Sequence, residues 1–247
     1  MSTPRPKNFH DQIVDTLGRR MVAGELAAGE RMPPEAQLAE SLGVSRLALR
    51  EAMKTLAAKG MVSIRTRTGT HVLPRRVWNL FDPAVLQWHA QGALDDKFVA
   101  DLMQLRRLIE PAAARLATLK ATPMQLQAIR VAFEAMVQAK DDGAYIAADL
   151  GFHGAVLDAC DNAFIGQLQG AIAEVLKVSF NASASPLPDD REKALALHRA
   201  LLLALEARDP VAAAAAVDRL IDRATERILA SRPAAGKRRS LRRQSGA

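Results

Sequence analysis

The stretch that decides the fold of the first region is Pro34-Glu35-Ala36-Gln37-Leu38-Ala39-Glu40-Ser41-Leu42-Gly43-Val44-Ser45-Arg46-Leu47-Ala48-Leu49-Arg50-Glu51-Ala52. Pro33 and Pro34 exclude helix just before Glu35, and Gly43 permits a tight turn between two helical segments. Ser45 predicts the N-cap of the second segment, because its hydroxyl can accept a hydrogen bond from an exposed backbone N–H. A short helix, a glycine turn and a longer helix in this order predict a helix-turn-helix.

Further elements are predicted on both sides of this stretch. A helix from about Asn8 to Ala23 precedes it, with an apolar stripe made of Ile13, Val14, Leu17 and Met21. The helix after Ser45 has a buried face at i, i+3, i+4, i+7 and i+8, namely Leu49, Ala52, Met53, Leu56 and Ala57. Gly60 ends that helix, and Met61–Arg65 and Thr70–Val72 predict a β-hairpin wing.

Arginines are placed on these elements where DNA contacts are expected. Arg46 and Arg50 lie one turn apart, and therefore side by side, near the start of the third helix. There an arginine fork can bond O6 and N7 of guanine in the major groove, while Arg65 and Arg67 of the wing can contact phosphates or the minor groove. A single arginine is more often a solvated surface charge. The prediction of a double-stranded DNA interface therefore depends on the whole order of elements.

The charge distribution favours a polyanionic partner for the first region alone. The net charge of +7 divides into +6 for residues 1–76, −4 for residues 77–232 and +5 for residues 233–247. Uneven charge is common among bacterial proteins, so charge by itself does not decide. The basic residues from Lys237 to Arg243 predict a disordered tail, which either adds salt-sensitive DNA affinity or has no role.

Composition indicates a cytoplasmic protein. Cys160 is the only cysteine, which excludes an intramolecular disulfide and fits a reducing compartment. Residues 1–20 are polar and charged, without an apolar segment of signal-peptide length. The longest uninterrupted apolar run, Val211–Val217, is far too short for a membrane span. We therefore expect no membrane partner.

Beyond about residue 95 long helical periods predict an all-α bundle. The first helix should be kinked or interrupted by Pro111, and Thr122-Pro123 with Gln125 predicts a capped helix start. One helix is expected from about Asn162 to Ser179, a loop from Ser183 to Asp190, and two last helices over 191–207 and from Asp209-Pro210 to Ser231.

The region between the two helical patterns contains both tryptophans, Trp78 and Trp88. A flexible linker has no need of such large apolar side chains, so we expect a connector packed onto a domain. The predicted organisation is a DNA-binding domain over 1–76, a packed connector over 77–95, a helical effector-binding and dimerisation domain over 96–232, and a basic tail over 233–247.

A candidate metal site lies in the helical region. Asp149 and His153 are one turn apart on one helix face, and His198 belongs to another helix. A carboxylate and an imidazole at this spacing can share a divalent metal such as zinc. From the spacing alone, an ion pair on a helix surface is the more common explanation.

The first region resembles the GntR family of bacterial regulators. The resemblance is carried by residues 34–39, Leu42 to Arg46, Leu49 to Ala52, Gly60 to Val62 and Gly69 to Val72. It implies operator contacts by Ser45, Arg46 and Arg50, with the wing around Thr66 and Arg67; Gln37, Arg65 and Gly69 complete the candidate DNA-binding set. The match departs from the family at Gln37, which occupies a position that is often arginine. One contact with the DNA backbone or with a base is therefore expected to be weaker.

Sequences with this first domain often carry an all-helical effector domain, the FCD domain, which residues 96–231 resemble more loosely. This resemblance implies metal ligands at Asp149, His153 and His198, and Leu220 stands where a last histidine is expected, so at most three protein ligands remain. Arg106, in Leu105-Arg106-Arg107-Leu108-Ile109-Glu110-Pro111, is the candidate for binding an acidic effector. A surface arginine is the alternative explanation. The four residues Arg106, Asp149, His153 and His198 form the candidate effector site.

The connector is similar to that of the galactonate-operon repressors within this family, which favours an aldonic or related sugar acid as effector. The prediction is a ligand-responsive, homodimeric repressor without enzymatic activity that leaves a palindromic operator when a small carboxylic acid binds. Two alternatives remain open: a metal-dependent hydrolase or lyase that uses Asp149, His153 and His198 with a DNA-binding appendage, and a constitutive DNA-binding protein without an effector. The operator and the effector's identity are not given by the sequence.

Overall fold

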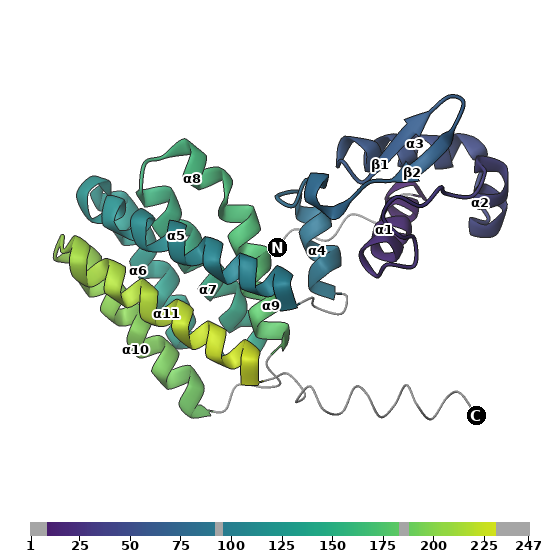
Figure 1. Cartoon of the computed structure of the whole chain (residues 1–247). Coiled ribbons are helices and arrows are strands. Elements are labelled where there is room, and N and C mark those ends of the chain that lie inside the picture. Colours follow the sequence, from purple (N-terminus) through teal and green to yellow (C-terminus); the bar gives the residue numbers. More distant parts are fainter. Residues whose placement is uncertain (1–8, 92–95, 183–187, 231–247) are drawn as a thin grey trace. The chain divides into compact units, whose positions relative to one another are not determined.

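The computed structural model describes residues 9–91, 96–182 and 188–230. It is mainly helical, with one two-stranded sheet in the described part of the chain, and confirms the predicted fold class (Figure 1). The chain divides into two compact units, residues 1–95 and residues 96–247. Each unit is considered by itself below.

The first unit is a winged helix-turn-helix. Its helices and strands are α1 (Phe9–Val22), α2 (Glu35–Leu42), α3 (Arg46–Ala58), β1 (Val62–Arg65) and β2 (Gly69–Val72). The strands are antiparallel, and their register places Val62 opposite Val72 and Arg65 opposite Gly69. Residues before α2 extend the hairpin, since Met32 N–H donates to the Thr70 carbonyl.

Local sequence explains how α2 and α3 are set at an angle. Gly43 ends α2 with φ of 65°, a left-handed conformation that costs glycine little. Ser45 then caps α3 by accepting a hydrogen bond from Ala48 N–H at 3.1 Å. The predicted apolar stripes are buried except at Ala57, which is partly buried, and Leu17, Leu49 and Leu56 are completely inaccessible. The unit is therefore held by one dry core beneath α3.

The tryptophan-containing segment packs onto this core. It forms a short 3-10 turn, η1 (Arg75–Val77), and a helix, α4 (Pro83–Gln91). Trp78, Val85 and Trp88 are buried in the core of the first unit. The Trp88 indole N–H donates to Asp15 Oδ1 on α1 at 2.8 Å, and its ring lies directly over Gly18, where a Cβ atom would come within 2.4 Å of it.

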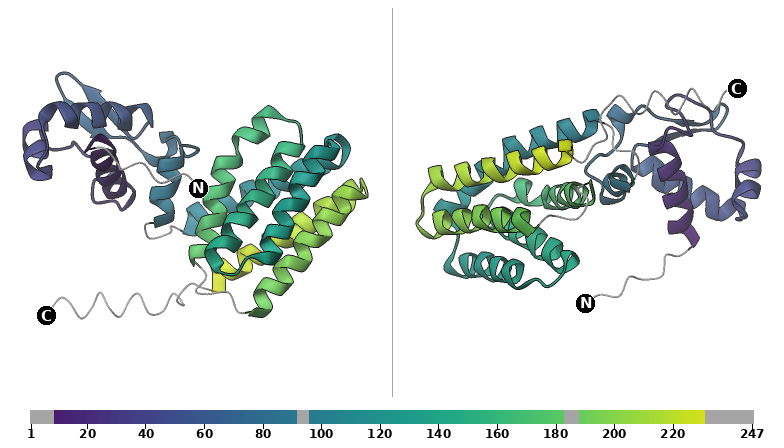
Figure 2. Two further views of the ribbon diagram at one scale, coloured as in Figure 1. Left: turned by 180° about the vertical axis from the view of Figure 1, so that it is seen from behind. Right: turned by 90° about the horizontal axis from the view of Figure 1, so that it is seen from below.

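The second unit is an all-helical bundle, seen from behind and from below in Figure 2. Its helices are α5 (Asp96–Lys120), α6 (Pro123–Gln138), α7 (Asp142–Ala159), α8 (Ala163–Gln167), α9 (Gln169–Ala182), α10 (Pro188–Glu206) and α11 (Pro210–Ala230). The predicted capping box is present at Thr122 and Gln125. No helix in the described ranges is both long enough and apolar enough to cross a membrane.

The structure differs from three expectations about these helices. Pro111 does not interrupt the first one, which was one of the two outcomes expected there, because Pro111 lies inside the 25-residue helix α5; the buried neighbours Ala113, Ala114 and Ala117 hold the helix in the bundle despite the lost backbone hydrogen bond. The helix expected from Asn162 to Ser179 is divided at Leu168 into α8 and α9. The last part of the expected loop belongs to α10, which begins at Pro188, a residue whose fixed φ suits a first helical turn. Residues 183–187 and Ser231 lie outside the described residues.

The bundle is tied together by contacts between segments far apart in sequence. The helix α5 packs against α7, α10 and α11, and α6 packs against α7 and α10. Arg208, in the turn between α10 and α11, donates to the carbonyls of Thr118 and Ala121 at 2.9 and 2.7 Å. This arginine satisfies carbonyl groups that the end of α5 would otherwise leave without partners.

Candidate functional site

The helix α3, which is the recognition helix of the helix-turn-helix, and the wing formed by β1 and β2 enclose a groove of about 460 Å³. Four of the candidate DNA-binding residues line it: Arg50, Arg65, Thr66 and Gly69. Arg31 and Lys54 also line it, so the groove carries four cationic side chains and one carboxylate, that of Glu35. A positive groove with a helix on one wall and a hairpin on the other suits a phosphate backbone next to a base-reading helix.

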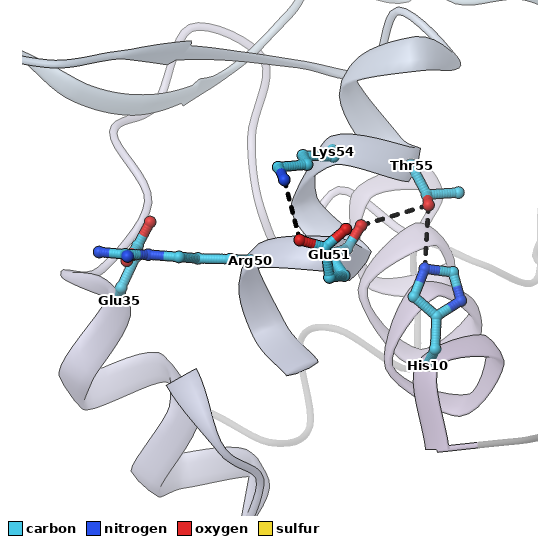
Figure 3. Close-up of polar contacts among 6 residues, drawn as sticks. All are labelled: His10, Glu35, Arg50, Glu51, Lys54 and Thr55. Carbon is cyan, nitrogen blue, oxygen red and sulfur yellow. Dashed lines mark hydrogen bonds and ion pairs between the residues drawn. The ribbon is translucent and has the colours of Figure 1, made fainter. Parts of the chain in front are cut away.

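Arg50 is held by a carboxylate from the neighbouring helix (Figure 3). Its Nε donates to Glu35 Oε2 at 2.7 Å, and the two side chains are 64% and 37% exposed. A contact through Nε leaves the two terminal nitrogens of the guanidinium directed elsewhere. Those two nitrogens are the pair that forms a fork on guanine, so the ion pair can hold Arg50 without occupying its reading edge.

The other DNA candidates lie outside the groove. Ser45 and Arg46 are exposed at the start of α3, Gln37 is exposed on α2, and Arg67 is exposed between the two strands. The structure therefore does not bring Arg46 and Arg50 into one cluster with the wing; it places Arg50 in the groove and Arg46 beside it on the helix start. Arg31 was assigned no role from the sequence. Its position before the Pro33-Pro34 break, paired with His71 of β2, could have indicated a wing-associated strand.

The start of α3 is electrostatically suited to an anion. The first turn of α3 contains no acidic residue, although a carboxylate there would normally stabilise the positive end of the helix. Thr55, further along α3, is tied to α1 by a 2.9 Å contact with His10 Nε2 (Figure 3). A firmly seated helix with an uncompensated positive start is what contact with a phosphate requires.

A second candidate site is a small cavity inside the bundle of the second unit. Its open space is about 50 Å³, and its walls come from α5, α7, α9, α10 and α11. The lining residues are Arg106, Tyr145, Asp149, His153, Leu176, Ala194, His198, Leu220, Arg223, Ala224 and Arg227. The structure therefore brings together all four residues of the predicted effector site, on three different helices.

Three metal-ligand donors meet in this cavity. The ligand atoms of Asp149, His153 and His198 lie within 4.8 Å of one another, and all three residues are buried. His198 Nε2 is 3.1 Å from Asp149 Oδ1 and 3.3 Å from His153 Nε2. Donor atoms around a tetrahedral zinc ion with bonds of about 2.0–2.1 Å are separated by roughly the same distances.

The contacts of the two histidines through Nδ1 leave a lone pair on each Nε2 atom. His198 Nδ1 donates to the Ala194 carbonyl at 2.8 Å, and a carbonyl can only accept, so this nitrogen carries the hydrogen. His153 Nδ1 faces Glu110 Oε2 at 3.5 Å. The neutral tautomers therefore direct lone pairs at one another and at Asp149, and either a proton or a cation must lie between them. These residues fit a divalent metal.

A buried ion pair stands behind this cluster. Arg106 and Glu110, one turn apart on α5, are 1% and 4% exposed, and Arg106 Nε donates to Glu110 Oε1 at 2.5 Å. Burial acts to raise the pKa of Glu110, but the charge of Arg106 and the hydrogen bond from His153 outweigh it and lower that pKa to about 2. Arg106 is thus a buried cation rather than a surface arginine, and its Nη1 has no hydrogen-bond partner.

Asp149 also remains ionised. Burial acts to raise its pKa, but the hydrogen bond and the charge of His198, together with the charges of His153 and Arg106, lower it. Its Oδ2 is buried without a hydrogen-bond partner. A buried carboxylate oxygen and a buried guanidinium nitrogen, both without partners, mark the cavity as a place where a polar ligand is expected.

Leu220, which stands where the family resemblance places a last histidine, lines the cavity from α11. Sequence reasoning missed the two arginines that share its helix face, Arg223 and Arg227, at i+3 and i+7 from Leu220. That spacing could have found them. Arg223 donates to Asp190 Oδ1 at 2.8 Å, and its Nε is buried without a partner. The cavity therefore has cationic groups on two sides, on α5 and on α11.

Two family matches cover most of this chain. Residues 9–72 match the bacterial regulatory proteins of the gntR family, and residues 101–223 match the FCD domain. The galactonate operon transcriptional repressor of Escherichia coli (strain K12) is 33% identical over 222 residues, which cover 90% of this chain and 97% of the repressor. The chain belongs to the GntR family. It is a DNA-binding transcriptional regulator of the GntR type with an FCD domain.

Other relatives of this GntR regulator agree in kind. The putative L-lactate dehydrogenase operon regulatory protein of Escherichia coli (strain K12) is 32% identical over 182 residues, 72% of this chain and 69% of that protein. The relatives of this chain are transcriptional regulators and not enzymes, so the alternative of a metal-dependent enzyme is not supported.

Solved structures share the fold. The protein Lar, which controls expression of the Listeria monocytogenes agr system, matches with a TM-score of 0.64 at 21% identity, over 91% of this GntR chain and 98% of its own. McbR/YncC of E. coli matches with a TM-score of 0.54 at 19% identity, over 90% and 97% of the two chains.

Proposed function

We propose that this regulator is a homodimeric repressor that binds a palindromic operator and is released when a small carboxylic acid, such as a sugar acid, enters the cavity of the second unit. The observation that carries the proposal is the buried, unpartnered Nη1 of Arg106 beside three converging metal-ligand donors. The 33% identity to a galactonate operon repressor over nearly its whole length supports a sugar acid as the effector.

On the DNA side, one protomer reads one half-site. The start of α3 enters the major groove with Arg46 and Arg50, and the wing residues Arg65 and Arg67 contact the adjoining backbone or minor groove. A two-fold symmetric dimer then matches a palindromic operator. Sedimentation of the protein with a single operator duplex tests the dimer; one protomer per operator at saturation would contradict it.

On the effector side, the cavity residues suit a carboxylate with hydroxyl neighbours. Arg106 can donate from Nη1 to a carboxylate oxygen, and Arg223 lines the same cavity from α11. Asp149, His153 and His198 would hold a divalent metal such as zinc. When bound, that ion would supply positive charge and a coordination position that Leu220 does not fill. Asp149 Oδ2 is in addition an acceptor for a ligand hydroxyl.

The size of the cavity explains how binding can act on the rest of the molecule. Space of about 50 Å³ accommodates a few water molecules at roughly 10–15 Å³ each in this measure, and a sugar acid is several times larger than a water molecule. Entry of a sugar acid therefore requires the lining helices to move apart. An effector that binds only the widened state shifts the population toward it, and this differential affinity is the available driving force.

The proposal is tested by titrating full-length protein on a fluorescent operator duplex with galactonate, other aldonates and lactate. We expect one acid to lower operator affinity at least tenfold, and Arg106→Lys, which keeps the charge but loses the fork, to abolish the response. Arg107→Lys, the adjacent arginine whose partner is the exposed Asp222, is the matched control and should respond normally. Unchanged affinity with every acid would leave a constitutive DNA-binding protein instead.

Metal content is a separate measurement. Protein purified without chelator should contain about one divalent metal ion per chain by elemental analysis, and His198→Ala should contain much less. A metal-free wild-type protein that also fails to take up added zinc would exclude the metal and leave the arginine-based carboxylate site to be judged by the operator titration.

A further inference from the structure

An exposed apolar side chain lies at the start of the recognition helix, α3, on the same face as its charged residues. The exposed face of α3 is formed by Leu47, Arg50, Glu51 and Lys54, at i, i+3, i+4 and i+7, opposite the buried Leu49, Ala52, Met53 and Leu56. Leu47 is 72% exposed, whereas the other three members of that face are charged. It is the second residue of α3, directly after Arg46.

The core does not account for this leucine. Three of its neighbours pack against the core of the first unit, namely Leu42, Val44 and Ala48. Leu47 does not belong to that set. Exposed apolar residues scattered singly over a surface are normal and need no function. Leu47 differs from them in its position, because it lies beside Arg46 and Arg50 at the N-terminal start of α3, the part of the helix proposed to enter the major groove.

Its charged neighbours are already compensated within the protein. Arg50 is paired with Glu35, and Lys54 donates to Glu51 at 2.8 Å (Figure 3). In a groove, these pairs orient the long side chains, and Leu47, one turn before Arg50 and Glu51 on α3, has no polar group of its own. It therefore cannot contribute a hydrogen bond to any base, and it would cover polar base edges at a cost.

Only one group on the base edges of the major groove is apolar, the C5-methyl group of thymine. We propose that Leu47 reads this methyl group and so requires a thymine in each operator half-site, next to the base contacted by Arg46 or Arg50. The inference rests on the proposed DNA-reading role of α3. It adds a specificity-determining residue that acts by apolar contact rather than by a hydrogen bond.

The test uses the full-length protein and duplexes selected by it from a random library. Each thymine of the enriched sequence is replaced in turn by uracil, which pairs identically and lacks only the methyl group. We expect one thymine position per half-site at which uracil weakens binding roughly fivefold, the effect of losing about one buried methyl contact. Leu47→Ala should bind thymine and uracil duplexes equally at that position and should keep its sensitivity at all others.

A matched control is Phe9→Ala, which removes another apolar side chain of 72% exposure from the same unit but not from α3. This variant should retain the uracil sensitivity. If uracil has no effect anywhere, or if Leu47→Ala keeps the wild-type sensitivity at the same position, the assignment of Leu47 is wrong while DNA reading by α3 stands. If no sequence is enriched, the proposed operator binding itself fails, and the role of Leu47 fails with it.

Discussion

The two units differ in where they keep their charges. Among the described residues of the first unit, every arginine, lysine, aspartate and glutamate is at least partly exposed, and its core is apolar apart from His89. The second unit buries Arg106, Glu110, Asp149, His153 and His198 in the middle of its bundle.

The difference agrees with the partners proposed for the two units. DNA is large and stays outside, so the first unit presents its charges on a surface whose ion pairs, such as Arg50–Glu35, are exposed and weak. The proposed effector is a small acid, which would have to be enclosed to be bound tightly, and the second unit carries charges inside that compensate one another. Buried charges cost desolvation free energy, which only full pairing offsets. The second unit should therefore be far more sensitive to loss of a single charge.

The largest effect is expected for Arg106→Ala. It leaves the Glu110 carboxylate buried and without its cationic partner, and we expect the free energy of unfolding to fall by about 3–5 kcal/mol. Arg107→Ala, which breaks an exposed pair with Asp222, should cost less than about 1 kcal/mol. Urea denaturation followed by circular dichroism measures both. Equal losses in the two variants would remove the contrast between buried and exposed charge.

A smaller effect is expected in the dry core of the first unit. Gly18→Ala places a Cβ within 2.4 Å of the buried Trp88 ring, and overpacking of this kind costs about 1–3 kcal/mol. Gly151→Ala on α7 meets no atom within 4 Å and should instead stabilise by about 0.5–1 kcal/mol. Opposite signs in thermal melts are the expected result. A stable Gly18→Ala protein would mean that α4 is not seated on α1 as described.

Operator reading is the next test of the exposed charges. Arg46→Ala should weaken operator binding roughly tenfold to a hundredfold and relax the base preference at one position, because a fork on guanine discriminates by about 1–3 kcal/mol. Lys237→Ala, in the basic segment that lies outside the described residues, should only reduce the salt dependence of binding. Binding assays on operator variants at two salt concentrations separate the two effects. An unaltered base preference in Arg46→Ala would overturn its assignment.

The smallest effect separates capping from DNA contact at Ser45. Ser45→Ala removes the hydrogen bond to Ala48 N–H and should lower stability by about 1 kcal/mol. Ser45→Asp keeps a capping oxygen and should melt near the wild-type temperature, yet its negative charge should strongly weaken DNA binding. If Ser45→Asp binds the operator as the wild type does, the start of α3 does not approach a phosphate.

Sequence reasoning succeeded where the signal is local. Ser45, Gly43 and the apolar stripe of α3 act within a few residues, and all of them are found as predicted. It failed at Pro111 and at Leu168, where packing in the bundle decides whether a helix continues. The cavity residues were predicted from the one-turn spacing of Asp149 and His153 and from the family resemblance. Arg223 and Arg227 were missed although they share the helix face of Leu220, and Arg31 was missed because its partner in β2 lies far away in the sequence.

The anchoring of α5 by Arg208 has a consequence for the order of events during synthesis. The longest link of the first unit noted above, from Trp88 to Asp15, spans 73 residues, all within the first 91 residues. In the second unit Arg208 lies 90 residues after Thr118, and the pair Arg107–Asp222 spans 115 residues. Contacts of long range close slowly, because the intervening chain must first be present and ordered. The DNA-binding unit is therefore expected to fold while the ribosome is still translating α5 to α11, and the helical bundle only after α11 has emerged.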